Sequence, residues 1–208
     1  MYARTTTVQA DPSKIDDGIA NIRDEVTPVI TEMDGCVGMS MLADRTSGRC
    51  IATSSWESEN ALRDSADRVR PLRDGAEQAL GASSSSTVDT WEVAVVHRDH
   101  AMPEGACARV TWMSGMGDNA DRASDVFRMA VLPRVQELDG FCSASLLISR
   151  ETGRAVGTVT FERREQLEAS RDAAAGIREA ASKDIGATID DVAEMEVAFA
   201  HLHLPEMA

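Results

Sequence analysis

Apolar residues recur at steps of three and four between residues 15 and 33, a spacing that predicts an amphipathic helix. The stripe consists of Ile15, Ile19, Ile22, Val26, Ile30 and Met33. Asp11 and Pro12 are typical of a helix start, and Asp34-Gly35 of a helix end. Because Pro28 lies within the stripe and has no backbone N–H, we expect it to kink or restart the helix.

The segments that follow favour strands and a second helix. In chain order we expect strands at 3–9, 36–45 and 49–57, a helix from Ser58 to about Gly81, and a strand at 88–97. A tight turn at 46–48 joins the second and third strands as a hairpin. Ser58 is a suitable helix cap, and Pro71 predicts a break or bend in the second helix.

The chain contains an internal repeat. A shift of 105 residues aligns positions 3–82 with 108–187 without a gap and gives 24 identities at 80 positions. The identities include Arg4 and Arg109, Pro28 and Pro133, Asp34-Gly35 and Asp139-Gly140, Gly48-Arg49 and Gly153-Arg154, Leu62 and Leu167, Arg73 and Arg178. After one deletion, Glu92-Val93-Ala94 aligns with Glu196-Val197-Ala198. We therefore predict two modules, 1–98 and 107–208, with a linker at 99–106.

The element order β-α-β-β-α-β predicts an α+β fold in which each module is ferredoxin-like. The second strand is apolar on both faces, since Val37, Met39 and Met41 alternate with Cys36, Gly38 and Leu42. A sheet with one face in water alternates polar and apolar residues instead. We therefore expect the two modules to pack sheet to sheet as an intramolecular α+β barrel, an internal pseudo-dimer that needs no second chain.

Composition excludes several classes of partner. The 208 residues include 35 acidic and 21 basic ones, for a net charge of −14, which argues against nucleic acid or an anionic membrane surface. No apolar run approaches the roughly 18 residues of a membrane span, and no signal peptide is evident, so we expect a cytoplasmic protein. Cys36, Cys50, Cys107 and Cys142 lack zinc-site or disulfide-framework spacing, which predicts reduced thiols.

Short motifs give a family resemblance. They are Asp34-Gly35 before the second strand, Gly48-Arg49 in the hairpin, and Trp56-Glu57-Ser58 followed by Ala61-Leu62 at the strand-to-helix junction. The second module keeps Asp139-Gly140, Gly153-Arg154, Phe161-Glu162 and Leu167. With this element order, both modules resemble the antibiotic biosynthesis monooxygenase (ABM) family, whose modules pair as α+β barrels.

The resemblance implies a cavity between sheet and helices, where the family's oxygenases oxidise polycyclic phenols or anthrones without metal or flavin. Trp56 matches the family's pocket tryptophan, and Phe161 is its counterpart in the second module. Both also suit a structural role as core residues at the strand-to-helix corner. The family's asparagine and tyrosine partners of the tryptophan are replaced by Ala52 and Leu62, so this sequence departs from the oxygenase pattern.

We expect no cofactor. The family's haem-degrading branch has a histidine on the second helix, where this chain has Ala66 and Arg171. Gly115-Met-Gly117 fits a dinucleotide-binding pattern, but the first module lacks it at the equivalent place, and Asp118 would repel a pyrophosphate.

Histidines and arginines are the remaining candidates for chemistry. His97 and His201 are repeat equivalents at the ends of the last strands. They are either candidate bases near neutral pH or partly exposed strand-end residues without a catalytic role. His201 and His203 lack a third ligand, so we expect no metal site. Arg4 and Arg109, on the first strands, either hold a ligand's carboxylate or enolate oxygen or form salt bridges with acidic neighbours such as Glu92 or Glu196.

The sequence therefore leaves two hypotheses. The first is a cofactor-independent monooxygenase that acts on a hydrophobic, aromatic small molecule, with Trp56, Phe161, Arg4 and Arg109 at the pocket. The alternative is a non-catalytic small-molecule binding or stress-associated protein that kept the cavity and lost the chemistry.

Overall fold

The structure, a computed structural model, describes residues 1–202 and divides into two compact units. Among these residues, unit 1 comprises Met1–Trp91 and 197–202, and unit 2 comprises Glu92–Glu196. Each of the two last strands is therefore divided between the units, β4 (Thr87–Arg98) after Trp91 and β8 (Thr188–Leu202) after Glu196. The repeat boundaries 1–98 and 107–208 stay a prediction, and residues 203–208 lie outside the described part.

Apart from η1, which is described only in unit 1, both units follow the same order of elements. Up to β4 these are β1 (Tyr2–Gln9), η1 (Pro12–Lys14), α1 (Ile15–Asn21), η2 (Ile22–Val26), α2 (Thr27–Thr31), β2 (Cys36–Ala43), β3 (Arg49–Trp56), α3 (Glu59–Asp64) and α4 (Ala66–Ala79). Up to β8 they are β5 (Cys107–Ser114), α5 (Ala120–Val126), η3 (Phe127–Val131), α6 (Leu132–Gln136), β6 (Phe141–Ser149), β7 (Arg154–Phe161), α7 (Arg164–Ala169) and α8 (Arg171–Ile185).

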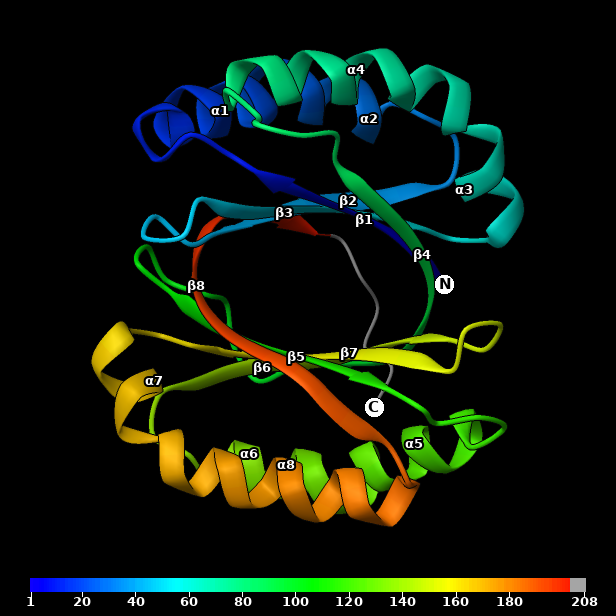
Figure 1. Cartoon of the computed structure of the whole chain (residues 1–208), viewed down its shortest axis with the longest axis vertical. Coiled ribbons are helices and arrows are strands. Elements are labelled where there is room, and N and C mark those ends of the chain that lie inside the picture. The colour runs from blue at the N-terminus through cyan, green and yellow to red at the C-terminus, as the bar shows by residue number, and fades with distance from the viewer. Residues whose placement is uncertain (203–208) are drawn as a thin grey trace. The chain divides into compact units, whose positions relative to one another are not determined.

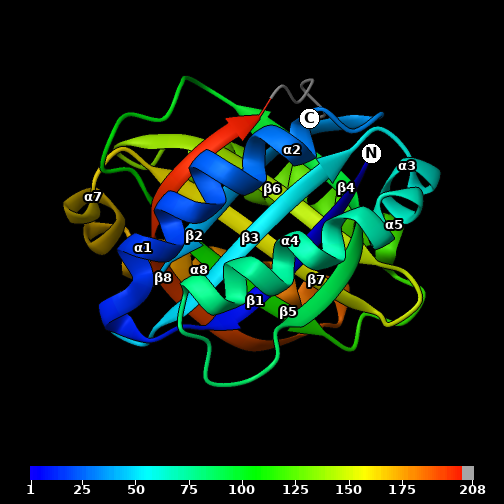
Figure 2. The same cartoon turned by 90° about the horizontal axis from the view of Figure 1, so that it is seen from above.

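The strands confirm the expected fold class. Each unit has the ferredoxin-like β-α-β-β-α-β order. The hydrogen-bonded strand order is β4-β1-β3-β2-β8 in unit 1 and β8-β5-β7-β6-β4 in unit 2. In each unit the helices cover one face of the sheet: α1, α2 and α4 lie over β1–β3, and α5, α6 and α8 lie over β5–β7 (Figure 1). Figure 2 shows the α1–α2 segment and α4 running side by side across the strands of unit 1.

The first helix of each unit contains a π turn directly before its proline. In unit 1 the N–H of Thr27 bonds to the carbonyl of Ile22, five residues back. Pro28 has no N–H to donate to the fourth residue before it, so an α-helical ladder cannot continue through this point. The expected restart at Pro28 thus takes the form of a widened turn, and Pro133 has the same effect in unit 2.

The second helix breaks at Ser65, whereas the sequence predicted a break or bend at Pro71. Ser58 caps α3 as expected, with its Oγ accepting from the N–H of Ala61 at 3.1 Å. The carbonyl of Leu62 then accepts from Ser65 Oγ at 2.7 Å and from the guanidinium of Arg4 at 2.5 Å. Because side-chain donors hydrogen-bond to this carbonyl, the first helical segment ends here and the helix restarts as α4. Pro71 lies inside α4 and does not break it.

Candidate functional site

Each unit contains a cavity between its sheet and its helices. The unit 2 cavity has a volume of about 70 Å³ and the unit 1 cavity about 40 Å³. One buried water needs about 10–15 Å³ on this scale, so the unit 2 cavity has room for several. Its apolar lining includes Met113, Phe127, Leu146, Phe161 and Ile177. An apolar cavity with a few polar groups is the usual form of a small-molecule site.

Arg4 is the buried polar group beside the unit 1 cavity. It is 6% exposed and lines the cavity from β1. Its Nη1 donates to Ser65 Oγ at 3.0 Å and its Nη2 to the carbonyl of Leu62. Burial lowers the pKa of Arg4, and the nearby Arg73 lowers it further. Within residues 1–202, these contacts include no carboxylate.

Arg109 occupies the equivalent place in unit 2 and does have a carboxylate. Its Nη1 donates to Ser170 Oγ at 2.9 Å and its Nη2 to the carbonyl of Leu167 at 2.6 Å. The same Nη2 also donates to Glu194 Oε1 at 2.9 Å. Burial raises the pKa of Glu194, but hydrogen bonds from Arg171 and Arg109 outweigh it, and the net pKa of this carboxyl lies below its ordinary value.

The identity of this partner corrects one expectation from the sequence. Glu92 and Glu196 were the acidic neighbours expected for the two arginines, but Glu92 pairs with Arg150 instead, at 2.6 Å. The β5–β8 register explains the choice of Glu194, because it places this residue directly opposite Arg109. The repeat alignment has Thr90 at the position of Glu194, so unit 1 has no equivalent acid there.

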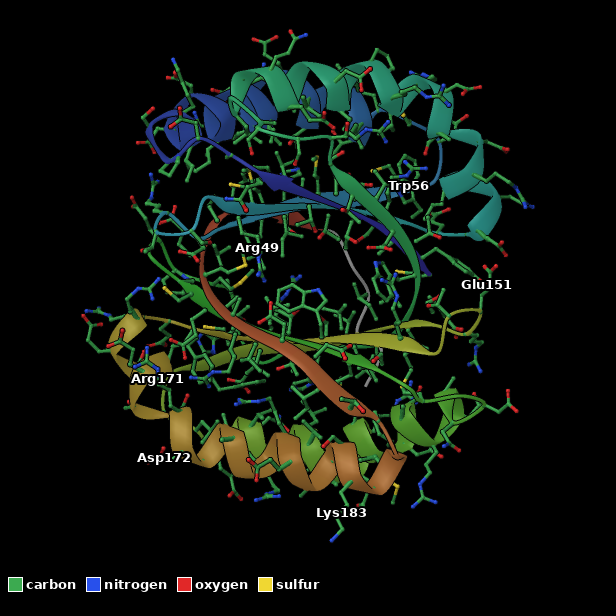
Figure 3. All side chains as sticks on the ribbon, in the orientation of Figure 1. Arg49, Trp56, Glu151, Arg171, Asp172 and Lys183 are labelled. Atoms are coloured by element: carbon green, nitrogen blue, oxygen red, sulfur yellow. The ribbon has the colours of Figure 1, made fainter. Side chains whose placement is uncertain are left out.

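Trp56 and Phe161 lie under these arginines. Both are 0% exposed, and the guanidinium carbons of Arg4 and Arg109 lie 5.8 and 5.7 Å from the respective ring centres. Trp56 lies beside α3 at the end of β3 (Figure 3), and its Nε1 donates to Ser54 Oγ at 3.1 Å. Phe161 lines the unit 2 cavity, whereas in unit 1 Ser54 takes part in the lining rather than Trp56. Trp56 is thus a core residue and is not among the described residues that line the unit 1 cavity.

A second pair of arginines also lines the cavities, and sequence reasoning gave it no role. Arg73 on α4 and Arg178 on α8 are repeat equivalents that line the unit 1 and unit 2 cavities. Nη1 of Arg178 is buried and has no hydrogen-bond partner within residues 1–202. Burial lowers the pKa of Arg178, and the charge of Arg109 lowers it further. The identity of Arg73 and Arg178 in the repeat was the signal that could have identified them.

The candidate bases lie elsewhere. Neither His97 nor His201 is among the described residues that line the two cavities. His97 stacks on Phe141 with ring centres 6.2 Å apart, and its Nε2 is 2.8 Å from the amide nitrogen of Gln136. His201 is exposed, and His203 lies outside the described residues.

The structure gives no group of metal ligands or reactive thiols in the described chain. Within residues 1–202, no three or more His, Cys, Asp or Glu side chains lie together as a group that could hold a metal ion. All four cysteines are free thiols. Burial raises the pKa of Cys142 to about 11, so this thiol stays protonated and weakly nucleophilic near neutral pH. Of the helices described, none is both long and apolar enough to cross a membrane.

Two proteins of Mycobacterium tuberculosis resemble the whole chain. The uncharacterized protein Rv2558 is 47% identical over 208 residues, which cover 100% of this chain and 87% of that protein. The uncharacterized protein Rv2557 is 44% identical over 207 residues, or 100% of this chain and 92% of that one.

Solved structures share the fold at low sequence identity. A proposed monooxygenase from Lactobacillus acidophilus has a TM-score of 0.68 at 7% identity and covers 97% of this chain and 96% of its own. An anthrone oxidase-like protein has a TM-score of 0.67 at 16% identity, with coverages of 100% and 94%. At these identities the likeness is one of fold alone.

The family model for antibiotic biosynthesis monooxygenases matches residues 1–68. This segment carries Arg4 and the Trp56 junction, and α3 ends within it. The second unit repeats the same order of elements and the same contacts from its buried arginine. Residues 1–68 thus match the antibiotic biosynthesis monooxygenase family, and unit 2 repeats the ferredoxin-like order of elements.

Proposed function

We propose that the protein binds a hydrophobic, aromatic small molecule in the unit 2 cavity. The observation that carries this proposal is the cavity itself: about 70 Å³ of space lined almost entirely by apolar side chains. Rings such as Phe127 and Phe161 and the flexible Met113 offer contacts that suit a flat apolar ligand.

Gly157 of β7 provides a way to fill this cavity. A Cβ at this position would lie 3.8 Å from Phe127 Cε2 and 3.9 Å from Met113 Cε, which is ordinary van der Waals contact. A Cβ at 157 therefore fits without a clash, and the larger valine side chain would take up space in the cavity. The repeat equivalent is Ala52, which lines the unit 1 cavity and offers a matched control.

The test is calorimetric titration with 2-naphthamide, a neutral aromatic probe. We expect the wild-type protein to bind it, Gly157→Val to weaken binding at least tenfold, and Ala52→Val to change it less than twofold. Thermal denaturation checks that both variants are folded. Equal binding by wild type and folded Gly157→Val would contradict the proposed site.

A second candidate function is cofactor-independent oxygenation, supported by the family match of residues 1–68 and by two cavity-lining guanidinium groups. Arg109 and Arg178 would lower the energy of a phenolate or enolate, the anion that reacts directly with O₂. For anthrone the balanced reaction is anthrone + O₂ → anthraquinone + H₂O. The substrate loses both hydrogens of its methylene group, one oxygen atom enters the product, and the other leaves as water.

The proton acceptor distinguishes the two candidates. The described lining of the unit 2 cavity includes no histidine, aspartate, glutamate or tyrosine. Oxygenation would therefore need water or a more distant base, for which His97 is the candidate in the same unit, and this favours binding as the first proposal. Oxygen-electrode measurements with anthrone test the second: catalysis requires uptake equal to the anthraquinone formed, and faster than with Gly157→Val. No uptake above that control leaves binding as the function.

A further inference from the structure

The two cavities differ in which arginine is neutralised. In unit 1 Arg73 has carboxylates nearby, with its Nε 3.8 Å from Glu77 and 3.9 Å from Asp74. In unit 2 the carboxylate of Glu194 pairs with Arg109 and Arg171 instead. The positions of Glu77 and Thr90 in unit 1 are occupied by Ser182 and Glu194 in unit 2. At this pair of positions, unit 1 therefore has its acid on the second helix, and unit 2 has its acid on the last strand.

This exchange leaves Arg178 without an ion-pair partner. No carboxylate oxygen within residues 1–202 lies within salt-bridge distance of its guanidinium. The charges of Glu179 and Glu194 are near enough to raise the pKa of Arg178. Glu194 is bound to two other guanidinium groups, and the Glu179 carboxylate forms no ion pair with Arg178 within residues 1–202. Of the two acids beside Arg73, Asp74 has an acidic equivalent in Glu179, whereas Glu77 is replaced by Ser182.

The unpaired atom belongs to the cavity. Arg178 lines it from α8, together with apolar neighbours on the same helix such as Ile177 and Ala174. Its buried Nη1 has no hydrogen-bond partner, and a buried, unsatisfied donor on a charged group is costly. A ligand that brings its own negative charge would supply both the hydrogen bond and the counter-charge.

We propose that the ligand of the unit 2 cavity is an organic anion, with an apolar ring system in the cavity and its carboxylate or similar anionic group bound to Arg178. This inference rests on the proposed function, since it names the chemical class of the molecule bound at the same site. It also assigns Arg178 as the residue that selects for charge. A planar guanidinium binds a carboxylate with paired hydrogen bonds, which suits this role.

The experiment compares 2-naphthoate with the neutral 2-naphthamide by calorimetry on the full chain. We expect the wild-type protein to bind 2-naphthoate at least tenfold more tightly than 2-naphthamide. Arg178→Gln should abolish this preference, so that the variant binds the two probes with Kd values within twofold of each other. Arg73→Gln, the matched change in unit 1, should leave the preference intact.

Ser182→Glu provides a second test that keeps Arg178. It restores the carboxylate that unit 1 has at Glu77, and we expect the new acid to neutralise Arg178 and abolish the preference for 2-naphthoate. Arg178→Lys keeps the charge without the planar guanidinium, and we expect it to retain part of the preference.

The outcomes separate this inference from the proposed function. If both probes bind equally in the wild type, or if Arg178→Gln keeps the preference, the anionic ligand class is wrong and the binding site stands. If neither probe binds, the proposed function and the inference fail together.

Discussion

Glu194 of β8 lies directly opposite Arg109 of β5, and Arg109 Nη2 donates to Glu194 Oε1 at 2.9 Å. Arg171, at the start of α8 (Figure 3), donates to Oε2 of the same carboxylate at 2.6 Å. One carboxylate thus forms ion pairs with two guanidinium groups. The side chains of Arg109 and Glu194 are 4% and 18% exposed, so solvent does little to screen their interaction.

Removal of this carboxylate should destabilise unit 2. We expect Glu194→Gln to lower the free energy of unfolding by about 2–3 kcal/mol, because Arg109 would remain buried without a counter-charge. Urea denaturation measures the change. The control is Glu92→Gln, which breaks the more exposed pair with Arg150 and should cost at most about 1 kcal/mol. Equal losses in the two variants would contradict the importance of burial at Glu194.

The same carboxylate should make stability depend on pH in the acid range. The pKa of Glu194 is lower in the folded chain than in the unfolded one, so between these two values the unfolded chain binds more protons. Its contribution is therefore present above the ordinary glutamate pKa of about 4.3 and is lost as pH falls through the lower folded value. The stability difference between wild type and Glu194→Gln should shrink as pH falls below about 4.5. A difference that stays constant down to pH 3 would contradict this assignment.

We expect Trp56 to contribute mainly to the stability of the fold. Because its side chain is 0% exposed and packs under Arg4, we expect Trp56→Ala to cost about 3–5 kcal/mol. Trp56→Phe copies the residue at 161 in the repeat and should cost about 1–2 kcal/mol, since it loses the hydrogen bond to Ser54 but keeps an aromatic ring. Thermal unfolding compares the two. Near-equal stability of the alanine variant and wild type would contradict a core role.

In the absence of ligand, we expect the Arg178 side chain to lower the free energy of unfolding. Replacement by methionine removes a charged group whose Nη1 is buried without a partner, and we expect a gain of about 1 kcal/mol. Arg171→Met, by contrast, breaks the contact with Glu194 and should be neutral or destabilising. Denaturation of both variants without ligand measures the difference. A clear loss of stability in Arg178→Met would mean that Arg178 already has a favourable partner in the empty protein.

Local sequence signals predicted most of the fold. The apolar stripe from Ile15 to Met33, the Thr46–Gly48 turn and the Ser58 cap all have short-range causes, and the corresponding elements form where they were expected. The break of the second helix was misplaced because its cause is long-range. Arg4, 58 residues away in sequence, donates to the Leu62 carbonyl, and no local pattern near Pro71 reveals this contact.

The candidate site was less predictable because it depends on pairing between distant residues. Arg4 and Arg109 were identified through the repeat, and both line cavities. The partner of Arg109 was missed because the β5–β8 register, and not proximity in sequence, selects Glu194 over Glu196. Arg178 was missed because a charged residue on an amphipathic helix usually faces solvent.

The most direct test of the account is to observe which cavity the ligand enters. Carbon-13 methyl labelling of methionine places reporters at Met113 in the unit 2 cavity, at Met39 and Met41 in the unit 1 cavity, and at the surface residue Met129. During titration with 2-naphthoate, the account predicts saturable shifts of the Met113 signal and little change at the other three. Shifts confined to Met129 or to the unit 1 methionines would contradict it.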